Sequence, residues 1–374
     1  MKDKYNPLFE PLRFTNGMTA RNRVAMAPMT HYSSNKDSSM NPEELPYFQR
    51  RAKGVGIVFT HCYAVTENGV AYQGEPLISD DRFIPDLKKI TQTIQKEGAL
   101  AVLQLHHGGA VCPPALVPEG DVVAPCAVQI PERGHVVPRA LSDEEIINII
   151  KAFGDGTRRA IEAGFDGVEL HGAYGYLLQQ FISPFSNQRD DQWGKKYAFP
   201  LTLIKHVKEV IKKCASAPFL LGYRFTPEEA LKPGLSMADA LHFTEALVQS
   251  DIDFIDVLIN DYRSKPRAGL VDLSEKRLCL IRRQVAGRLP VFGGGAIFTA
   301  EEGLEALGTG IDAITIGREL IIDPEWVQKI QDGKEESIVT EFKKDDTREM
   351  LTIPFPFWQV IWRQQGWFPG TLKE

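Results

Sequence analysis

Two residues five positions apart have side chains suited to acid–base chemistry. His171 directly follows residues 167–170, a short run expected to form a strand, and Tyr176 lies in the turn beyond it. An imidazole at a strand end can donate a hydrogen bond to a substrate oxygen, and a tyrosine hydroxyl can deliver a proton. Both residue types are also common in partly buried structural positions, so the pair alone leaves a purely structural role open.

Glycines at two other places indicate a phosphate site. Gly294 and Gly295 precede a helix start at Thr299, and Gly317 is followed by Arg318. Backbone amides approach a phosphate closely at glycine, a helix start adds free N–H groups, and arginine adds a two-pronged cation. Glycine is also an ordinary turn residue, so each position alone could be structural. Both positions follow strands seven and eight of the fold expected below, where barrels commonly bind phosphate, and we therefore predict such a site.

Further polar side chains fall at the ends of other expected strands. Thr30 and Cys62 follow the first two strands, Gln104 ends the third, and Arg224 ends the fifth. The His106-His107 pair follows Gln104, but no set of convergent acidic and histidine ligands accompanies it. We therefore predict no metal and expect these histidines to pack or to line the site.

One unit repeats along the chain and predicts the fold. Three segments begin with a hydroxyl residue followed three positions later by an acid, at Ser142, Ser236 and Thr299. Such a pair caps the first turn of a helix. Each helix leads through Asp into a short apolar run, as a strand buried on both faces requires. Eight such strands are expected, at residues 23–26, 56–59, 99–105, 167–170, 219–225, 252–258, 290–292 and 311–316.

Alternating helices and buried strands indicate an α/β fold, a single (β/α)8 TIM barrel, with a doubly wound open sheet as the alternative. We assign residues 1–335 to the barrel and 336–374 to a C-terminal extension. The proline-rich loop 106–139 follows the third strand, so it can cap the active site. Further helices are expected at residues 43–53, 84–96, 199–213, 274–286 and 324–330.

Composition excludes several classes of protein. A formal charge of −6 without a basic stripe argues against nucleic-acid binding. No apolar run reaches the length of a membrane span, and the first residues contain no apolar signal segment. The five cysteines are scattered and odd in number, which is typical of a protein of the reducing cytoplasm and not of a disulfide framework.

Several motifs, in order along residues 7–323, resemble those of the Old Yellow Enzyme family. The most specific is Gly167-Val168-Glu169-Leu170-His171, which continues through Gly175-Tyr176-Leu177-Leu178-Gln179-Gln180-Phe181-Ile182-Ser183-Pro184. Asn22-Arg23-Val24-Ala25-Met26-Ala27-Pro28-Met29-Thr30 resembles the family's opening strand, and Gly317-Arg318-Glu319-Leu320 also matches. The resemblance implies FMN at the mouth of the barrel, reduced by NADH or NADPH and reoxidised by an activated alkene.

The resemblance also implies a role for each matching residue. Thr30 would donate to the flavin carbonyl beside N5, Gln104 would match the pyrimidine edge, and Arg224 would lie near N1. His171 would hold the substrate oxygen, and Tyr176 would protonate the α-carbon. The remaining residues expected to hold the flavin ring are Ala27, Pro28, Met29 and Cys62; Gly294, Gly295, Gly317 and Arg318 would hold its phosphate, and Tyr32 would contact substrate.

The chain departs from the family at Tyr174. The family pairs the histidine with a His or Asn three residues later, whereas a tyrosine stands here. Tyr174 can still donate one hydrogen bond beside His171, and we include it among the catalytic and substrate-binding residues. The change bears on substrate type and rate, so a barrel that reduces quinones or free flavin, or an FMN-binding redox module without alkene turnover, stays an alternative.

The C-terminal extension is rich in aromatic residues and holds three of the five tryptophans. It could pack on its own barrel or contribute to a subunit interface, where aromatic residues are enriched. We favour the interface and expect a homo-oligomer acting on a small molecule, with no nucleic-acid or membrane partner.

Overall fold

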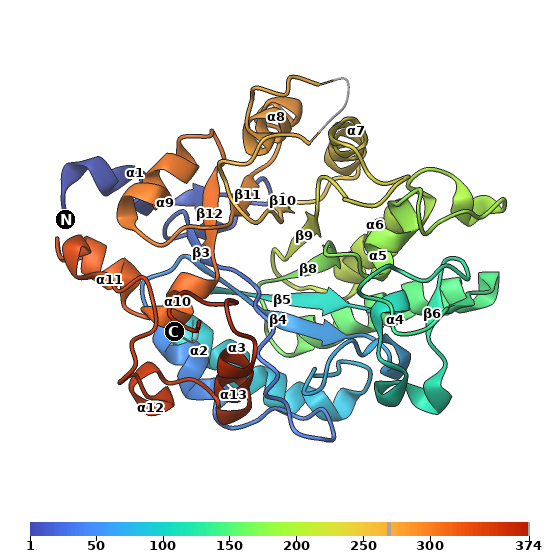
Figure 1. Ribbon diagram of the computed structural model, residues 1–374, viewed down its shortest axis with the longest axis horizontal. Helices are drawn as coiled ribbons and strands as arrows, with labels where there is room; N and C mark the ends of the chain where they lie inside the picture. Colours follow the sequence, from blue (N-terminus) through green and yellow to red (C-terminus); the bar gives the residue numbers. More distant parts are fainter. Residues whose placement is uncertain (268–270, 373–374) are drawn as a thin grey trace.

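The (β/α)8 barrel expected from the sequence is confirmed. The computed structural model describes residues 1–267 and 271–372. Eight parallel strands close into a barrel in the order β10-β11-β12-β3-β4-β5-β8-β9 (Figure 1). They are β3 (Val24–Met26), β4 (Ile57–Ala64), β5 (Leu100–His106), β8 (Gly167–Gly172), β9 (Leu220–Phe225), β10 (Phe254–Val257), β11 (Val291–Gly294) and β12 (Ala313–Ile316).

A helix follows each strand and covers the outside of the barrel. The seven crossovers contain α2 (Glu44–Ala52), α3 (Ile84–Lys96), α4 (Asp143–Glu162), α6 (Ala198–Cys214), α7 (Met237–Val248), α8 (Arg277–Val285) and α9 (Ala300–Leu307). The capping boxes predicted at Ser142, Ser236 and Thr299 are present, because each hydroxyl accepts from the third amide of its helix and the acid there accepts from the cap. These helix starts were therefore set locally.

The N-terminal end of the barrel is closed by apolar side chains. A short hairpin, β1 (Leu12–Arg13) and β2 (Thr19–Ala20), brings Phe14 against Phe254 and Phe292, with ring centroids 6.2 and 6.3 Å away. Phe59 packs on the same two rings at 5.6 and 5.7 Å. All four rings are buried, so the cavity described below opens at the opposite end.

The structure changes some expected boundaries. The second strand was predicted to end at residue 59 but runs to Ala64, with a register shift between Phe59 and Cys62. Five short α-helices of the described residues were not predicted, and we attribute this to their length, since four to nine residues carry little periodic signal. They are α1 (Asn6–Phe9), α5 (Leu177–Ile182), α10 (Arg318–Ile322), α12 (Arg348–Leu351) and α13 (Phe355–Arg363). The predicted helix near 324–330 is α11 (Trp326–Gln331).

The C-terminal extension packs on the barrel beside α2. Arg51 of α2 donates to the Leu351 carbonyl of α12 (Arg348–Leu351), and Phe357 of α13 lies 6.3 Å from the Tyr47 ring. Phe357, Ile361 and Phe368 are buried within this one chain. Residues 373–374 of the extension lie outside the described residues. A contribution of the extension to a subunit interface stays a prediction.

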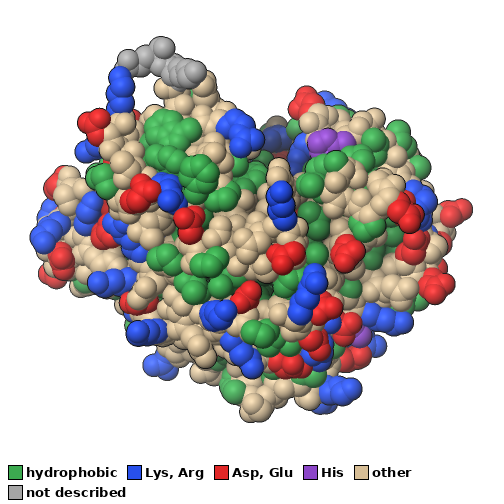
Figure 2. Space-filling model, turned by 90° about the horizontal axis from the view of Figure 1, so that it is seen from below, with side chains coloured by type: hydrophobic (Ala, Val, Ile, Leu, Met, Phe, Trp, Pro, Cys, Tyr) green, Lys and Arg blue, Asp and Glu red, His purple; other side chains and the backbone are tan. Residues whose placement is uncertain are grey.

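The surface is mixed in charge on the face seen in Figure 2, where basic and acidic side chains alternate without a large area of either sign. Within residues 1–267 and 271–372, no helix is both long and apolar enough to span a membrane.

Candidate active site

A cavity of about 870 Å³ lies at the C-terminal ends of the barrel strands. Every site residue named from the sequence lines it: Ala27, Pro28, Met29, Thr30, Tyr32, Cys62, Gln104, His171, Tyr174, Tyr176, Arg224, Gly294, Gly295, Gly317 and Arg318. The strands bring these residues together because parallel strands in a barrel end at one common face.

Gly295 after β11 and Gly317 after β12 lie where a side chain would collide with neighbouring atoms. A Cβ at Gly295 would collide with the Ile259 carbonyl oxygen, and its φ of +97° is strained for other residues. A Cβ at Gly317 would lie 2.8 Å from the Met29 sulfur. Arg318 beside them extends along the Phe298 ring and donates to the Trp367 carbonyl at 3.3 Å. Open backbone and a cation at one end of the cavity fit a phosphate group.

The deeper wall of the cavity carries polar residues of adjacent strands. Gln104 lies opposite Glu169 in the strand register and donates to its carboxyl oxygen at 2.5 Å. Arg224 lies opposite Asp256, with Nε 3.3 Å from the carboxylate. Gln104 and Arg224 reach the cavity, whereas Glu169 and Asp256 are fully buried behind them. Gln104 and Arg224 could therefore match the heteroatom edge of an isoalloxazine ring.

Glu169 and Asp256 have too few hydrogen-bond donors and cations around them for both carboxyl groups to be negatively charged. Among the described residues, one oxygen of Glu169 and both oxygens of Asp256 are buried without a hydrogen-bond donor. Burial, and then the neighbouring Asp256, raise the pKa of Glu169; burial also raises the pKa of Asp256 against the effect of Arg224. One proton held by the pair leaves Arg224 with a single negative partner, so this wall is close to neutral.

His171 and Tyr176 lie side by side at the cavity, with ring centroids 5.3 Å apart. Burial, assisted by His106, Arg224 and Arg133, lowers the pKa of His171 well below its usual value, so the ring is neutral. Burial raises the pKa of Tyr176 and keeps its phenol protonated. His106 packs edge-on against Tyr176 at 4.3 Å and is held by Glu75 at 2.6 Å. A neutral imidazole and a protonated phenol can both donate to a bound molecule.

Tyr174 is placed differently from His171 and Tyr176. Its φ is +58°, its N–H donates to Thr226 at 3.0 Å, and its side chain is 56% exposed. The guanidinium of Arg133, from the loop after β5, lies 4.1 Å above the Tyr174 ring and 5.1 Å from the Tyr176 ring. Tyr174 thus stands at the rim of the cavity under a cation.

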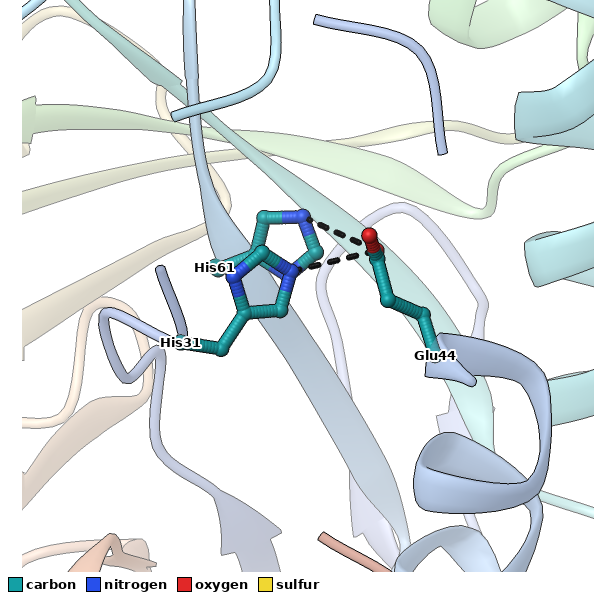
Figure 3. Close-up of side chains that lie close together, drawn as sticks. All are labelled: His31, Glu44 and His61. Atoms are coloured by element: carbon teal, nitrogen blue, oxygen red, sulfur yellow. Dashed lines mark ion pairs between the residues drawn. The ribbon is translucent and has the colours of Figure 1, made fainter. Parts of the chain in front are cut away.

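A buried cluster of charged and histidine side chains adjoins two segments that line the cavity. Glu44, at the start of α2, points its carboxylate at His31 and His61, with Nε2–Oε2 distances of 3.1 and 3.6 Å (Figure 3). These residue types can bind a metal. However, His31 Nδ1 accepts from the Ser33 amide at 3.3 Å, which leaves the ring proton on Nε2, facing Glu44. Among the described residues, His31 Nε2, Glu44 Oε2 and both ring nitrogens of His61 are buried without a hydrogen-bond partner, so the contacts with Glu44 are ion-pair contacts. His31 and His61 directly adjoin Thr30 and Cys62 in the sequence, so the packing of this cluster helps to position two residues that line the cavity.

Sequence reasoning missed several lining residues that come from distant loops. Arg133 and His135 come from the loop after β5, and Gln364 and Trp367 come from the C-terminal extension. The aromatic richness of the extension was a signal, but it was interpreted as a possible interface. Neither segment has a periodic pattern that would show which way its side chains point.

Comparison with known proteins shows the family of the chain. The sequence model of the NADH:flavin oxidoreductase / NADH oxidase family matches residues 7–337. The probable NADH-dependent flavin oxidoreductase YqiG of Bacillus subtilis is 46% identical over 99% of both chains. The NADH:fumarate oxidoreductase of Klebsiella pneumoniae is 36% identical over 94% of this chain, which spans only 38% of that longer protein.

Solved structures agree as well. The Old Yellow Enzyme homologue from Zymomonas mobilis superposes with a TM-score of 0.77 and 27% identity over 93% of this chain and 99% of that one. A structure of morphinone reductase in complex with tetrahydroNAD gives 0.74 and 26%, covering 87% of this chain and 91% of that one. The chain therefore belongs to the Old Yellow Enzyme family of FMN-containing oxidoreductases. It is an NAD(P)H-dependent flavin oxidoreductase that acts on small molecules.

Proposed function

We propose that this enzyme reduces activated alkenes, namely unsaturated carbonyl or nitro compounds, in a ping-pong cycle driven by NADH or NADPH. The observation that carries the proposal is the pairing of neutral His171 with protonated Tyr176 at one cavity. Reduction of a polarised C=C bond needs an oxygen-binding donor and a separate proton source, and these two side chains can supply them.

The cavity fits FMN at both ends. Gly294, Gly295, Gly317 and Arg318 would hold the phosphate. Gln104 and Arg224 would hold the pyrimidine edge, and Thr30, Cys62 and the segment 27–29 would hold the remaining ring edge. When bound, FMN stores two electrons from the nicotinamide and passes them on as hydride.

The chain's own residues then handle the acceptor. His171 donates to the substrate oxygen and stabilises the charge that develops there, while Tyr176 delivers its phenolic proton to the α-carbon. Tyr32 and Tyr174 line the same cavity, with the Tyr174 ring 6.0 Å from that of Tyr176, and both would contact the substrate. We retain a cytoplasmic location as a proposal, in keeping with the five free cysteines. A homo-oligomer also stays a proposal.

The test separates the two half-reactions by stopped-flow absorbance. Tyr176→Phe should leave reduction of the flavin by NADH or NADPH unchanged and slow reoxidation by an enone about 10²–10⁴-fold. Equal losses in both steps would make Tyr176 structural. A wild-type enzyme that reduces a quinone or free flavin but no enone or nitroalkene would replace alkene reduction with the alternative function.

A further inference from the structure

The cavity has an uneven distribution of charge. Among the described residues that line it, Arg133, Arg224 and Arg318 carry positive charge, and none is Asp or Glu. Arg318 lies at the phosphate end, and Arg224 is paired with Asp256. Arg133 is not at the phosphate end, and among the described residues it pairs with no carboxylate. A cleft lined by charge of one sign attracts ligands of the opposite sign.

Arg133 is held where a substrate would meet the acid–base pair. It donates to the Tyr174 carbonyl, lies over the Tyr174 ring, and is partly buried. In the part of the chain that the structure describes, it forms no ion pair with a carboxylate. Burial is the main cause of the low pKa of His171 and of the raised pKa of Tyr176; the charge of Arg133 adds to the first shift and opposes the second, so the guanidinium acts electrostatically on both groups proposed to contact the substrate.

We propose that Arg133 makes this site selective for acceptors that carry a carboxylate, that is, α,β-unsaturated acids. This inference rests on the proposed function and names its substrate class. A planar guanidinium can bind both oxygens of a carboxylate, while the neutral amide or hydroxyl donors of an enone site offer no charge.

The chemistry explains why such an acceptor needs a cation. Hydride forms a C–H bond at the β-carbon, the C=C π bond breaks, and its electron pair moves onto a group that is already negative. Arg133 compensates the second negative charge as it develops, which hydrogen bonds from His171 alone would do less well. Tyr176 then gives its proton to the α-carbon and is reprotonated by solvent. NADH or NADPH supplies the two electrons and is oxidised in the other half-reaction.

The experiment compares an acid with its neutral ester in the FMN-loaded enzyme. Wild type should reduce crotonate with a higher kcat/KM than an Arg133→Gln variant by about 10- to 100-fold, as expected for one charge-assisted contact. Methyl crotonate should change by less than about threefold, because no charge is lost from its contacts. Arg133→Lys should give a kcat/KM for crotonate between those of wild type and Arg133→Gln, because lysine keeps the positive charge but cannot bind both carboxylate oxygens as a planar guanidinium does. Glu132→Gln, at the exposed neighbouring position, is the matched control and should change neither substrate.

A binding measurement keeps the inference separate from alkene turnover. Benzoate, but not benzamide, should perturb the absorbance of the oxidised flavin, and Arg133→Gln should abolish that perturbation. If no alkene is reduced but benzoate binds through Arg133, the proposed anion-binding role of Arg133 is supported and the proposed alkene reduction is wrong. Equal losses on crotonate and its ester, or no preference for benzoate, would overturn the proposal. A loss confined to flavin reduction by NADH or NADPH would assign Arg133 to the dinucleotide and would also overturn it.

Discussion

The two ends of this barrel are built from the same strands and differ in chemistry within a few residues. On β10, buried Phe254 belongs to the apolar N-terminal end, and Asp256, two residues later, contacts Arg224. On β5, Val102 belongs to that apolar end and Gln104 lines the cavity. Since alternate residues of a strand share a face, one step of about 7 Å separates a close-packed core from a polar site.

The comparison shows how the barrel divides its tasks. The apolar end supplies burial without polar atoms that need partners, and it is sealed by the hairpin carrying Phe14. The polar end keeps two buried acids, several orphaned oxygens and a cavity, all of which reduce stability. Changes at the two ends should therefore be separable into effects on folding and effects on binding.

The largest effect should come from Phe292→Ala at the apolar end. Phe292 is buried against Phe59, Phe254 and Phe14, so its removal leaves a cavity that rigid strands cannot close. We expect a loss of about 3–5 kcal/mol in the free energy of unfolding. Urea denaturation of the FMN-free protein measures it. An FMN dissociation constant raised in proportion to this loss would contradict the separation of the two ends.

Arg318→Ala should show the opposite pattern. Its guanidinium is assigned to the phosphate, so FMN binding should weaken by about 1.5–3 kcal/mol. The FMN-free protein loses only the contacts with Trp367 and Phe298, so its free energy of unfolding should fall by less than this. Titration of flavin fluorescence gives the dissociation constant, and an unchanged value would remove Arg318 from the site. Arg263→Ala, an exposed arginine that contacts Glu302, serves as control.

Glu169→Gln should change how stability depends on pH. In the wild type, the raised pKa of about 8 means that the folded chain keeps a proton which the unfolded chain releases near pH 4.5. This group's contribution is therefore full below pH 4.5 and declines as pH rises to about 8, by at most about 1.4 kcal/mol per pH unit. Glutamine cannot ionise, so the variant should lack this decline. Urea denaturation across pH 4 to 9 tests it, and a variant-to-wild-type difference constant with pH would show that Glu169 is ionised.

The smallest effect should come from Tyr174→Asn at the rim. Asparagine tolerates the positive φ at this position and offers a shorter donor beside His171. If Tyr174 helps to hold the substrate oxygen, enone turnover should rise and phenolate should bind the oxidised flavin more tightly, with a charge-transfer band. A strong band in wild type that Tyr174→Asn and Tyr174→His both abolish would show that tyrosine is itself a competent donor.

Most of the site was accessible from the sequence because its residues sit at strand ends. The run that ends in His171, the glycines before Thr299 and the Gly317-Arg318 pair each carry a local signal. Once eight strands are inferred, barrel closure brings these positions to one face without knowledge of any contact. No comparable rule places residues of long loops or of the C-terminal extension, so Arg133 and Trp367 were not identified from the sequence.

The sequence by itself determined the barrel, the capped helix starts and the flavin-type motifs, since each depends on local patterns of apolar, hydroxyl and glycine residues. Only the tertiary structure decided which charges meet. It placed Arg133 over Tyr174, Asp256 against Arg224, and Glu44 against two adjacent histidines, in each case joining residues from different segments. Such contacts depend on how loops and strands pack in three dimensions, and sequence spacing does not encode that packing.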